Sequence, residues 1–134
     1  MDYFSDLKRL LDSHIANLKS IAPTEQLNKR IVQHLNRTID VAKEIALQEP
    51  KKSRLLIEYL ENESRTFGWS YPENLKEEKC EDSFWQLKNS LEIIIGSMTV
   101  NERLYFFGYL DDYEKLNPKH NSDKERIRRM LFIK

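Results

Sequence analysis

The sequence predicts an all-α protein: a single domain over residues 1–134, folded as an irregular bundle of about six helices, or helical hairpins, with no sheet. Apolar residues recur every three or four positions almost throughout, and no segment keeps the alternation of a strand. Glycine (3) and proline (4) are scarce, which argues against a β protein with many turns. With 40% apolar and 33% charged residues, the chain is long enough to bury a core under a solvated surface.

The first three helices are predicted from apolar stripes and from the residues that interrupt them. The stripes cover Phe4–Ile21 and Leu27–Ile45, and a third helix contains Leu55–Leu60. Asp2 or Ser5 is the candidate N-cap of the first helix, and Pro23 ends it because the residue before a proline avoids the α region. Thr24 is the candidate cap of the second helix, which stops near Glu49-Pro50. The third helix is expected to end before Gly68, a residue suited to a left-handed stop.

The second half of the chain predicts three more helices. A long stripe over Cys80–Met98 has nearly strict three-four spacing. Thr99 and Glu102 have the spacing of a capping box and open a fifth helix that is apolar on more than one face, from Leu104 to Leu110, and ends at Asn117-Pro118. Ser122 and Glu125 form a second capping-box pattern. It opens a short last helix containing Ile127, Met130 and Leu131.

The connection RTFGWSYPENL, residues 65–75, concentrates aromatic residues in an otherwise charged chain. Phe67 is expected to close the end of the bundle, with Gly68 permitting the turn. For Trp69 and Tyr71 two interpretations stay open, packing in the core or contact with a partner. Exposed aromatic residues beside carboxylates suit recognition of a basic protein, because aromatics supply contact area and charge steers the encounter.

The net charge is zero, but the charges are unevenly distributed along the chain. Residues 1–57 carry 10 basic and 7 acidic groups, residues 58–114 carry 5 and 13, and residues 115–134 carry 7 and 2. This pattern predicts either an acidic surface for a basic partner or ion pairs between helices. The predicted partner-binding residues are Glu58, Glu61, Trp69, Tyr71, Glu73, Glu77, Asp111, Asp112 and Glu114.

We predict no enzyme activity, no catalytic residues, no metal and no cofactor. The three histidines, His14, His34 and His120, are far apart in the sequence, and none has a second candidate ligand beside it. The pairs Asp40/Glu44 and Glu77/Glu81 lie one turn apart, which is also the pattern of a solvated helix face. Cys80 falls in an apolar stripe and is expected to be a core residue rather than a nucleophile. The glycines stand alone, so there is no phosphate-binding loop.

Location and nucleic-acid binding depend on other parts of the sequence. The N-terminus lacks the pattern of a secretory signal, no apolar run approaches the length of a membrane span, and one cysteine fits a reducing compartment. A cytoplasmic protein is expected. The basic segment KERIRRMLFIK, residues 124–134, allows a nucleic-acid-associated regulator as an alternative, although basic residues also complement the end of a helix.

Two segments carry a resemblance to a known class of proteins. VNERLYFFGYLDDYEKL, residues 100–116, has V-N-E-R-L followed by an apolar turn, Gly-x-Leu and an acidic pair, and FGWSYPENL, residues 67–75, accompanies it. Together with its size and helical content, the chain resembles immunity proteins of bacterial polymorphic-toxin and contact-dependent growth inhibition systems. The resemblance implies a cytoplasmic protein that binds and neutralises a cognate toxin domain, often a nuclease with a basic cleft. A helical adaptor or regulatory subunit of another bacterial complex is the alternative, and the oligomeric state stays open.

Overall fold

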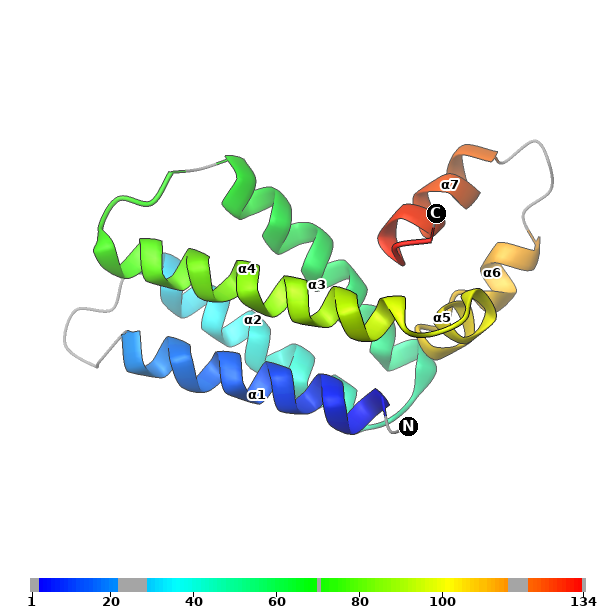
Figure 1. Cartoon of the computed structure of the whole chain (residues 1–134), viewed down its shortest axis with the longest axis horizontal. Coiled ribbons are helices and arrows are strands. Elements are labelled where there is room, and N and C mark those ends of the chain that lie inside the picture. Colours follow the sequence, from blue (N-terminus) through cyan, green and yellow to red (C-terminus); the bar gives the residue numbers. More distant parts are fainter. Residues whose placement is uncertain (1–2, 22–28, 70, 116–120, 134) are drawn as a thin grey trace.

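A computed structural model gives the structure of the chain and describes residues 3–21, 29–69, 71–115 and 121–133. These residues form seven helices and no strand, which confirms the all-α prediction (Figure 1). The helices are α1 (Tyr3–Ile21), α2 (Lys29–Ala46), α3 (Pro50–Trp69), α4 (Leu75–Gly96), α5 (Val100–Phe106), α6 (Leu110–Lys115) and α7 (Asn121–Met130).

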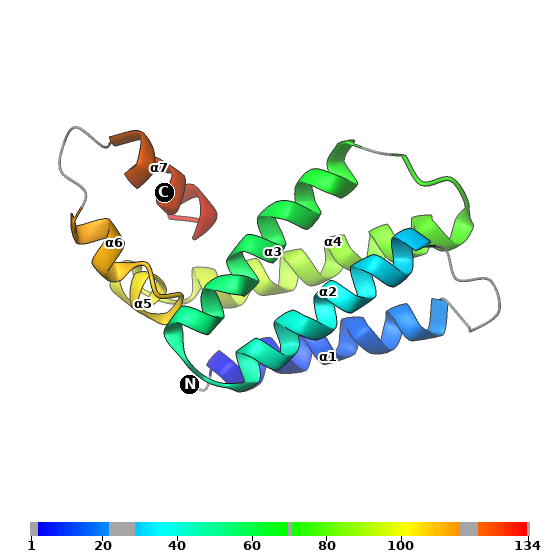
Figure 2. The ribbon, with the colours of Figure 1, turned by 180° about the vertical axis from the view of Figure 1, so that it is seen from behind.

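The four long helices form the bundle, and they bury the apolar stripes seen in the sequence. α1 packs against both α2 and α4, whereas α3 packs mainly against α2 (Figure 2). In α1, the buried leucines Leu7, Leu11 and Leu18 follow the spacing of one helix face. Phe84 of α4 is fully buried and contacts Phe67 of α3, at a ring distance of 5.0 Å. Phe67 therefore closes the α3 end of the core, as predicted.

Local helix signals were predicted with mixed success. The Thr99 capping box is confirmed: the Thr99 hydroxyl accepts from the Glu102 amide at 3.1 Å, and the Glu102 carboxylate accepts from the Thr99 amide at 2.8 Å. The predictions for Ser5 and Ser122 are wrong, because α1 begins at Tyr3 and α7 at Asn121, which puts both serines inside a first turn. Asp2, Pro23, Thr24 and Asn117-Pro118 lie outside the described residues.

Two glycine positions also differ from the expectation. Gly68 does not end α3, which continues to Trp69. The fifth predicted helix is instead interrupted at Gly108, where φ is 75° and the chain separates α5 from α6. The Tyr109 amide donates to the Leu104 carbonyl at 2.7 Å and the Gly108 amide to the Tyr105 carbonyl at 3.0 Å. This is a Schellman turn, and it needs a residue that tolerates the left-handed conformation.

Arg103 joins the end of α4 to the C-terminal turn of the chain. Its guanidinium donates to the carbonyls of Gly96 at 3.1 Å and Met98 at 3.0 Å. It also donates to the carbonyls of Leu131 at 3.3 Å and Phe132 at 2.8 Å. Arg103, in the V-N-E-R-L segment, therefore holds the turn after α7 against the end of α4, because its side chain donates to carbonyls on both sides.

We predict that Arg103→Met lowers the free energy of unfolding by about 2–4 kcal/mol, because four carbonyls lose a charged donor. Urea denaturation at neutral pH measures the change. Arg9→Met is the matched control, since the Arg9 side chain is 70% exposed on α1, and we expect it to change stability by no more than about 0.5 kcal/mol. Equal effects of the two substitutions would contradict this role of Arg103.

Candidate functional site

A chain of polar side chains crosses the core and takes one residue from each long helix. The Ser83 hydroxyl of α4 lies 2.8 Å from Nδ1 of His14 on α1. His14 Nε2 lies 2.9 Å from Nε2 of His34 on α2, and His34 Nδ1 lies 3.4 Å from a carboxylate oxygen of Glu63 on α3. His14, His34 and Glu63 are all buried. The expectation that each histidine lacks a neighbouring ligand is thus wrong for His14 and His34, while His120 lies outside the described residues.

Further residues form hydrogen bonds with members of this polar chain. Arg37 binds the Glu63 carboxylate with two nitrogens: Nε donates to Oε1, and Nη2 donates to Oε2 at 3.1 Å. The Thr38 hydroxyl donates to the His34 carbonyl at 2.8 Å and accepts from the Tyr59 hydroxyl at 2.8 Å. A buried carboxylate is tolerated when it is paired in this way.

The surroundings set the protonation of the polar chain. Burial and the neighbouring His34 lower the pKa of His14 to about 3, so His14 is neutral at physiological pH. Burial alone raises the pKa of Glu63, but the hydrogen bonds from His34 and Arg37 outweigh it and leave that pKa below its usual value. Burial raises the pKa of Tyr59, which keeps its hydroxyl protonated. These directions give a neutral His14, a protonated Tyr59 and a charged Glu63 carboxylate.

Ser83, His14 and His34 lie in the order of a nucleophile, a base and an orienting group. An effective general base has a pKa near the operating pH. His14, with a pKa of about 3, is far too weak a base for that role. Cys80 is buried, as predicted, and burial raises its pKa to about 12, which suppresses the thiolate. Among the described residues, no group of three or more His, Cys, Asp or Glu side chains is arranged to hold a metal ion.

The polar chain predicts a loss of stability in acid. Because the folded state holds the His14 pKa below 6.5, the unfolded chain binds more protons as the pH falls. Stability from this group is therefore complete above pH 6.5 and is lost progressively toward pH 3. We expect the free energy of unfolding to fall by about 2 kcal/mol between pH 7 and pH 5.

Urea denaturation across this pH range measures the effect, and His14→Gln is the comparison. Glutamine keeps a donor near His34 but does not titrate, so we expect its loss between the same pH values to be clearly smaller. The lowered pKa of Glu63 adds a further loss only below its ordinary value of 4.5. A glutamine variant with the same pH dependence as the original chain would contradict the assignment to His14.

The residues predicted to bind a partner do not form one acidic face. Trp69 and Tyr71 are 85% and 92% exposed at the α3–α4 connection, where Glu73 and Leu75 are also exposed. Asp111, Asp112 and Glu114 are exposed on α6, near the other end of α3 (Figure 1). The sequence prediction therefore joined two groups that the fold holds apart.

Two predicted residues have other contacts in the structure. Glu77 is buried: its carboxylate accepts from the Glu73 amide at 2.9 Å and lies 3.5 Å from Arg30. Including Glu77 in an exposed surface was therefore wrong, and its carboxylate helps to order the start of α4. Glu61 is half-buried and pairs with Arg65 at 3.1 Å and with Arg126 of α7 at 3.7 Å.

One stripe of α3 nevertheless presents both an acidic residue and the tryptophan to solvent. Glu58, Asn62, Arg65 and Trp69 are all exposed, and their spacing of three and four places them on the same helix face. We call this stripe the outer face of α3. The opposite side carries the buried residues Leu56, Leu60, Glu63 and Phe67.

Comparisons of the chain with protein-family models, curated proteins and solved structures found no match. No helix in the described ranges has the length and apolar content needed to cross a membrane. Sequence reasoning missed the polar chain because its residues come from four helices, and only a three-dimensional arrangement brings them together.

Proposed function

We propose that the chain is a non-catalytic protein-binding module, and that its contact surface is the outer face of α3 together with the α3–α4 connection. The exposure of Trp69 (85%) and Tyr71 (92%) is the observation that supports this proposal most directly. Each aromatic side chain offers about 150–250 Å² of apolar surface, and tryptophan and tyrosine dominate many interfaces. The adjacent Phe67 is buried, so the two exposed rings are not needed to close the core.

The outer face of α3 has a size that suits a single partner. Glu58 and Trp69 are separated by eleven residues of helix, or about 16 Å along its axis. A standard interface covers about 800 Å² on each partner, which corresponds to a patch roughly 30 Å across. One partner can therefore cover Glu58, Trp69 and Tyr71 together.

The partner that we propose is the cognate toxin domain of a bacterial polymorphic-toxin or contact-dependent inhibition system, with a basic surface. Four of the predicted carboxylates, those of Glu58, Glu73, Asp111 and Glu114, are exposed and form no ion pair within the described residues. Such groups attract a basic protein and can occupy positions that substrate phosphates take in a nuclease cleft. The resemblance of residues 67–75 and 100–116 to immunity proteins also supports this partner.

A protection assay tests the proposed function. The chain is expressed together with each protein encoded beside its gene in the native genome, and growth of the host is compared with and without the chain. We expect restored growth and a complex that elutes as one species from a sizing column. Full toxicity in the presence of folded chain, with no complex, would rule out this partner.

We predict that Trp69→Ala weakens partner binding by about 30-fold, the effect of losing a hot-spot tryptophan worth about 2 kcal/mol. The melting temperature should hardly change, because the removed ring is 85% exposed. Isothermal titration measures affinity, and thermal denaturation measures stability. Tyr105→Ala is the matched control, since Tyr105 is 64% exposed on α5 and lies outside the proposed surface. Equal losses for both variants, or none for Trp69→Ala, would contradict the proposed surface.

We also predict that Glu58→Lys slows association with the partner, because it reverses a charge on the outer face of α3. Stopped-flow association rates measured at low and moderate salt test this, and the difference from the original chain should shrink as salt screens the charge. Lys8→Glu is the control because it reverses a charge on α1, where Lys8 pairs with Asp12. A rate that is unchanged by Glu58→Lys at low salt would remove Glu58 from the interface.

A further inference from the structure

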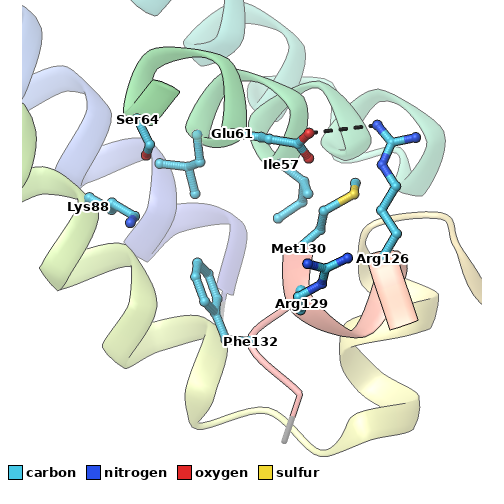
Figure 3. Close-up of a pocket in the computed structure, with 9 residues that line it drawn as sticks. Ile57, Glu61, Ser64, Lys88, Arg126, Arg129, Met130 and Phe132 are labelled. Carbon is cyan, nitrogen blue, oxygen red and sulfur yellow. Dashed lines mark ion pairs between the residues drawn. The ribbon is translucent and has the colours of Figure 1, made fainter. Parts of the chain in front are cut away.

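A pocket of about 370 Å³ lies between α3, α4 and the C-terminal turn after α7. α3 supplies Ile57, Leu60, Glu61 and Ser64, α4 supplies Lys88, and the C-terminal segment supplies Arg126, Arg129, Met130 and Phe132 (Figure 3). The volume lies within the range of small-molecule sites, about 300–1,000 Å³. α3 and α4 touch where Phe84 meets Phe67 and Tyr59, and the pocket lies between these helices farther along α4, at Lys88.

The pocket combines an apolar interior with an excess of positive charge. Ile57 and Leu60 are buried in its wall, and Met130 and Phe132 are half-buried. Three cationic side chains face one carboxylate: Lys88, Arg126 and Arg129 against Glu61. Arg126 pairs with Glu61 at 3.7 Å and Lys88 with Glu92 at 3.6 Å.

Arg129 offers hydrogen-bond donors that no described residue uses in an ion pair. The Arg129 guanidinium forms no ion pair with any described residue, and Figure 3 places it beside Met130 at the pocket. The Ser64 hydroxyl is inaccessible to solvent and has no hydrogen-bond partner in the described structure. A buried hydroxyl without a partner is costly. Because the Ser64 hydroxyl is closed to solvent and Arg129 is exposed, Arg129 is the donor on which the ligand contact depends.

The neighbouring half of the same groove has the opposite charge. A second pocket of about 510 Å³ shares Glu61, Arg126 and Met130 with the first. Its charged residues are the carboxylates of Glu58, Glu61, Asp112 and Asp123 and the guanidiniums of Arg54 and Arg126. The excess of positive charge is therefore confined to the end of the groove at Lys88 and Arg129.

Phe132 occupies a backbone position that normally favours glycine. Its φ is 57°, and it closes α7 with a Schellman turn in which the Ile133 amide donates to the Arg128 carbonyl at 2.8 Å. The equivalent turn after α5 carries Gly108. A large aromatic residue in the left-handed region is strained. Here the strained residue is also a wall of the pocket.

We propose that this pocket binds a small carboxylate with an apolar body, such as a medium-chain fatty acid. The apolar part lies against Ile57, Leu60, Met130 and Phe132, and the carboxylate accepts hydrogen bonds from Arg129. This inference does not rest on the proposed protein-binding function. None of the residues that line the pocket belongs to the outer face of α3, although the adjoining pocket contains Glu58 of that face.

Titration of the ¹⁵N-labelled full chain with decanoate tests the proposal, with chemical-shift changes as the readout. We expect saturable binding in the low-millimolar range or tighter, with changes concentrated at residues 57–64, 88 and 129–133. Decyltrimethylammonium has the same chain length and the opposite charge, so we expect it to bind at least tenfold more weakly. Equal binding of the two probes, or decanoate shifts located elsewhere, would overturn the proposal.

Arg129→Gln should weaken decanoate binding by about tenfold, since one charge-assisted contact is lost. Arg128→Gln is the control on the same helix: the Arg128 guanidinium donates to the Tyr113 hydroxyl at 3.2 Å and does not line the pocket. Phe132→Gly relieves the strained turn but removes a wall, so decanoate binding should be lost while the melting temperature changes little. Unchanged binding in both Arg129→Gln and Phe132→Gly would also overturn the proposal.

Discussion

The buried carboxylate of Glu63 is the constraint on which the arrangement of the four long helices depends. A charge in the core is tolerated only when it is paired, and removing one partner of a buried pair costs about 3–5 kcal/mol. Glu63 of α3 meets Arg37 and His34 of α2, and His34 continues through His14 of α1 to Ser83 of α4. Sliding any of these helices by one turn, about 5.4 Å, would leave a buried polar group without its partner. The polar chain therefore specifies helix register more narrowly than the surrounding leucines and isoleucines, which tolerate exchange among similar shapes.

Part of the uneven charge of the sequence is paired within the folded chain. Arg30, Arg37 and Arg54, from the basic first segment, contact Glu77, Glu63 and Asp112, from the acidic middle segment. Arg126, from the basic last segment, contacts Glu61. The ion-pair interpretation of the charge pattern therefore holds for these residues, and the acidic surface for a basic partner stays a proposal. Some acidic residues hold helices together. Glu58 and Glu73 are exposed and form no ion pair within the described part of the chain, and these are the carboxylates that the proposed partner would meet.

The sequence predicted features that depend on residues close together in the chain better than features that depend on contacts between helices. The Thr99 capping box, the buried Cys80 and the buried Phe67 were predicted because each depends on neighbouring residues or on one helix stripe. The break at Gly108 was missed because the aromatic run around it continues an apolar pattern, although the turn is defined by hydrogen bonds across only six residues. The polar chain and the buried Glu77 were missed for a different reason. In both, the partner of a charged or polar side chain comes from another helix, and spacing along one helix carries no information about it.

α3 is the helix from which both proposed binding surfaces arise, and its packing explains why. The inner side of α3 packs against α2 through Glu63, Tyr59 and Phe67. This packing leaves the outer face of α3 open. α3 also touches α4, where Phe84 packs against Phe67 and Tyr59. α7 and the turn after it then lie across the space between α3 and α4, held by the carbonyl contacts of Arg103 and by the Glu61–Arg126 pair. Because the Glu61–Arg126 pair is only partly buried, it adds little energy by itself. The Arg103 contacts and the buried side chains of Leu131 and Ile133 therefore supply most of the attachment. A ligand in the pocket would add contacts between α3 and the C-terminal turn, and so would stabilise the docked position of α7 by the free energy of its binding.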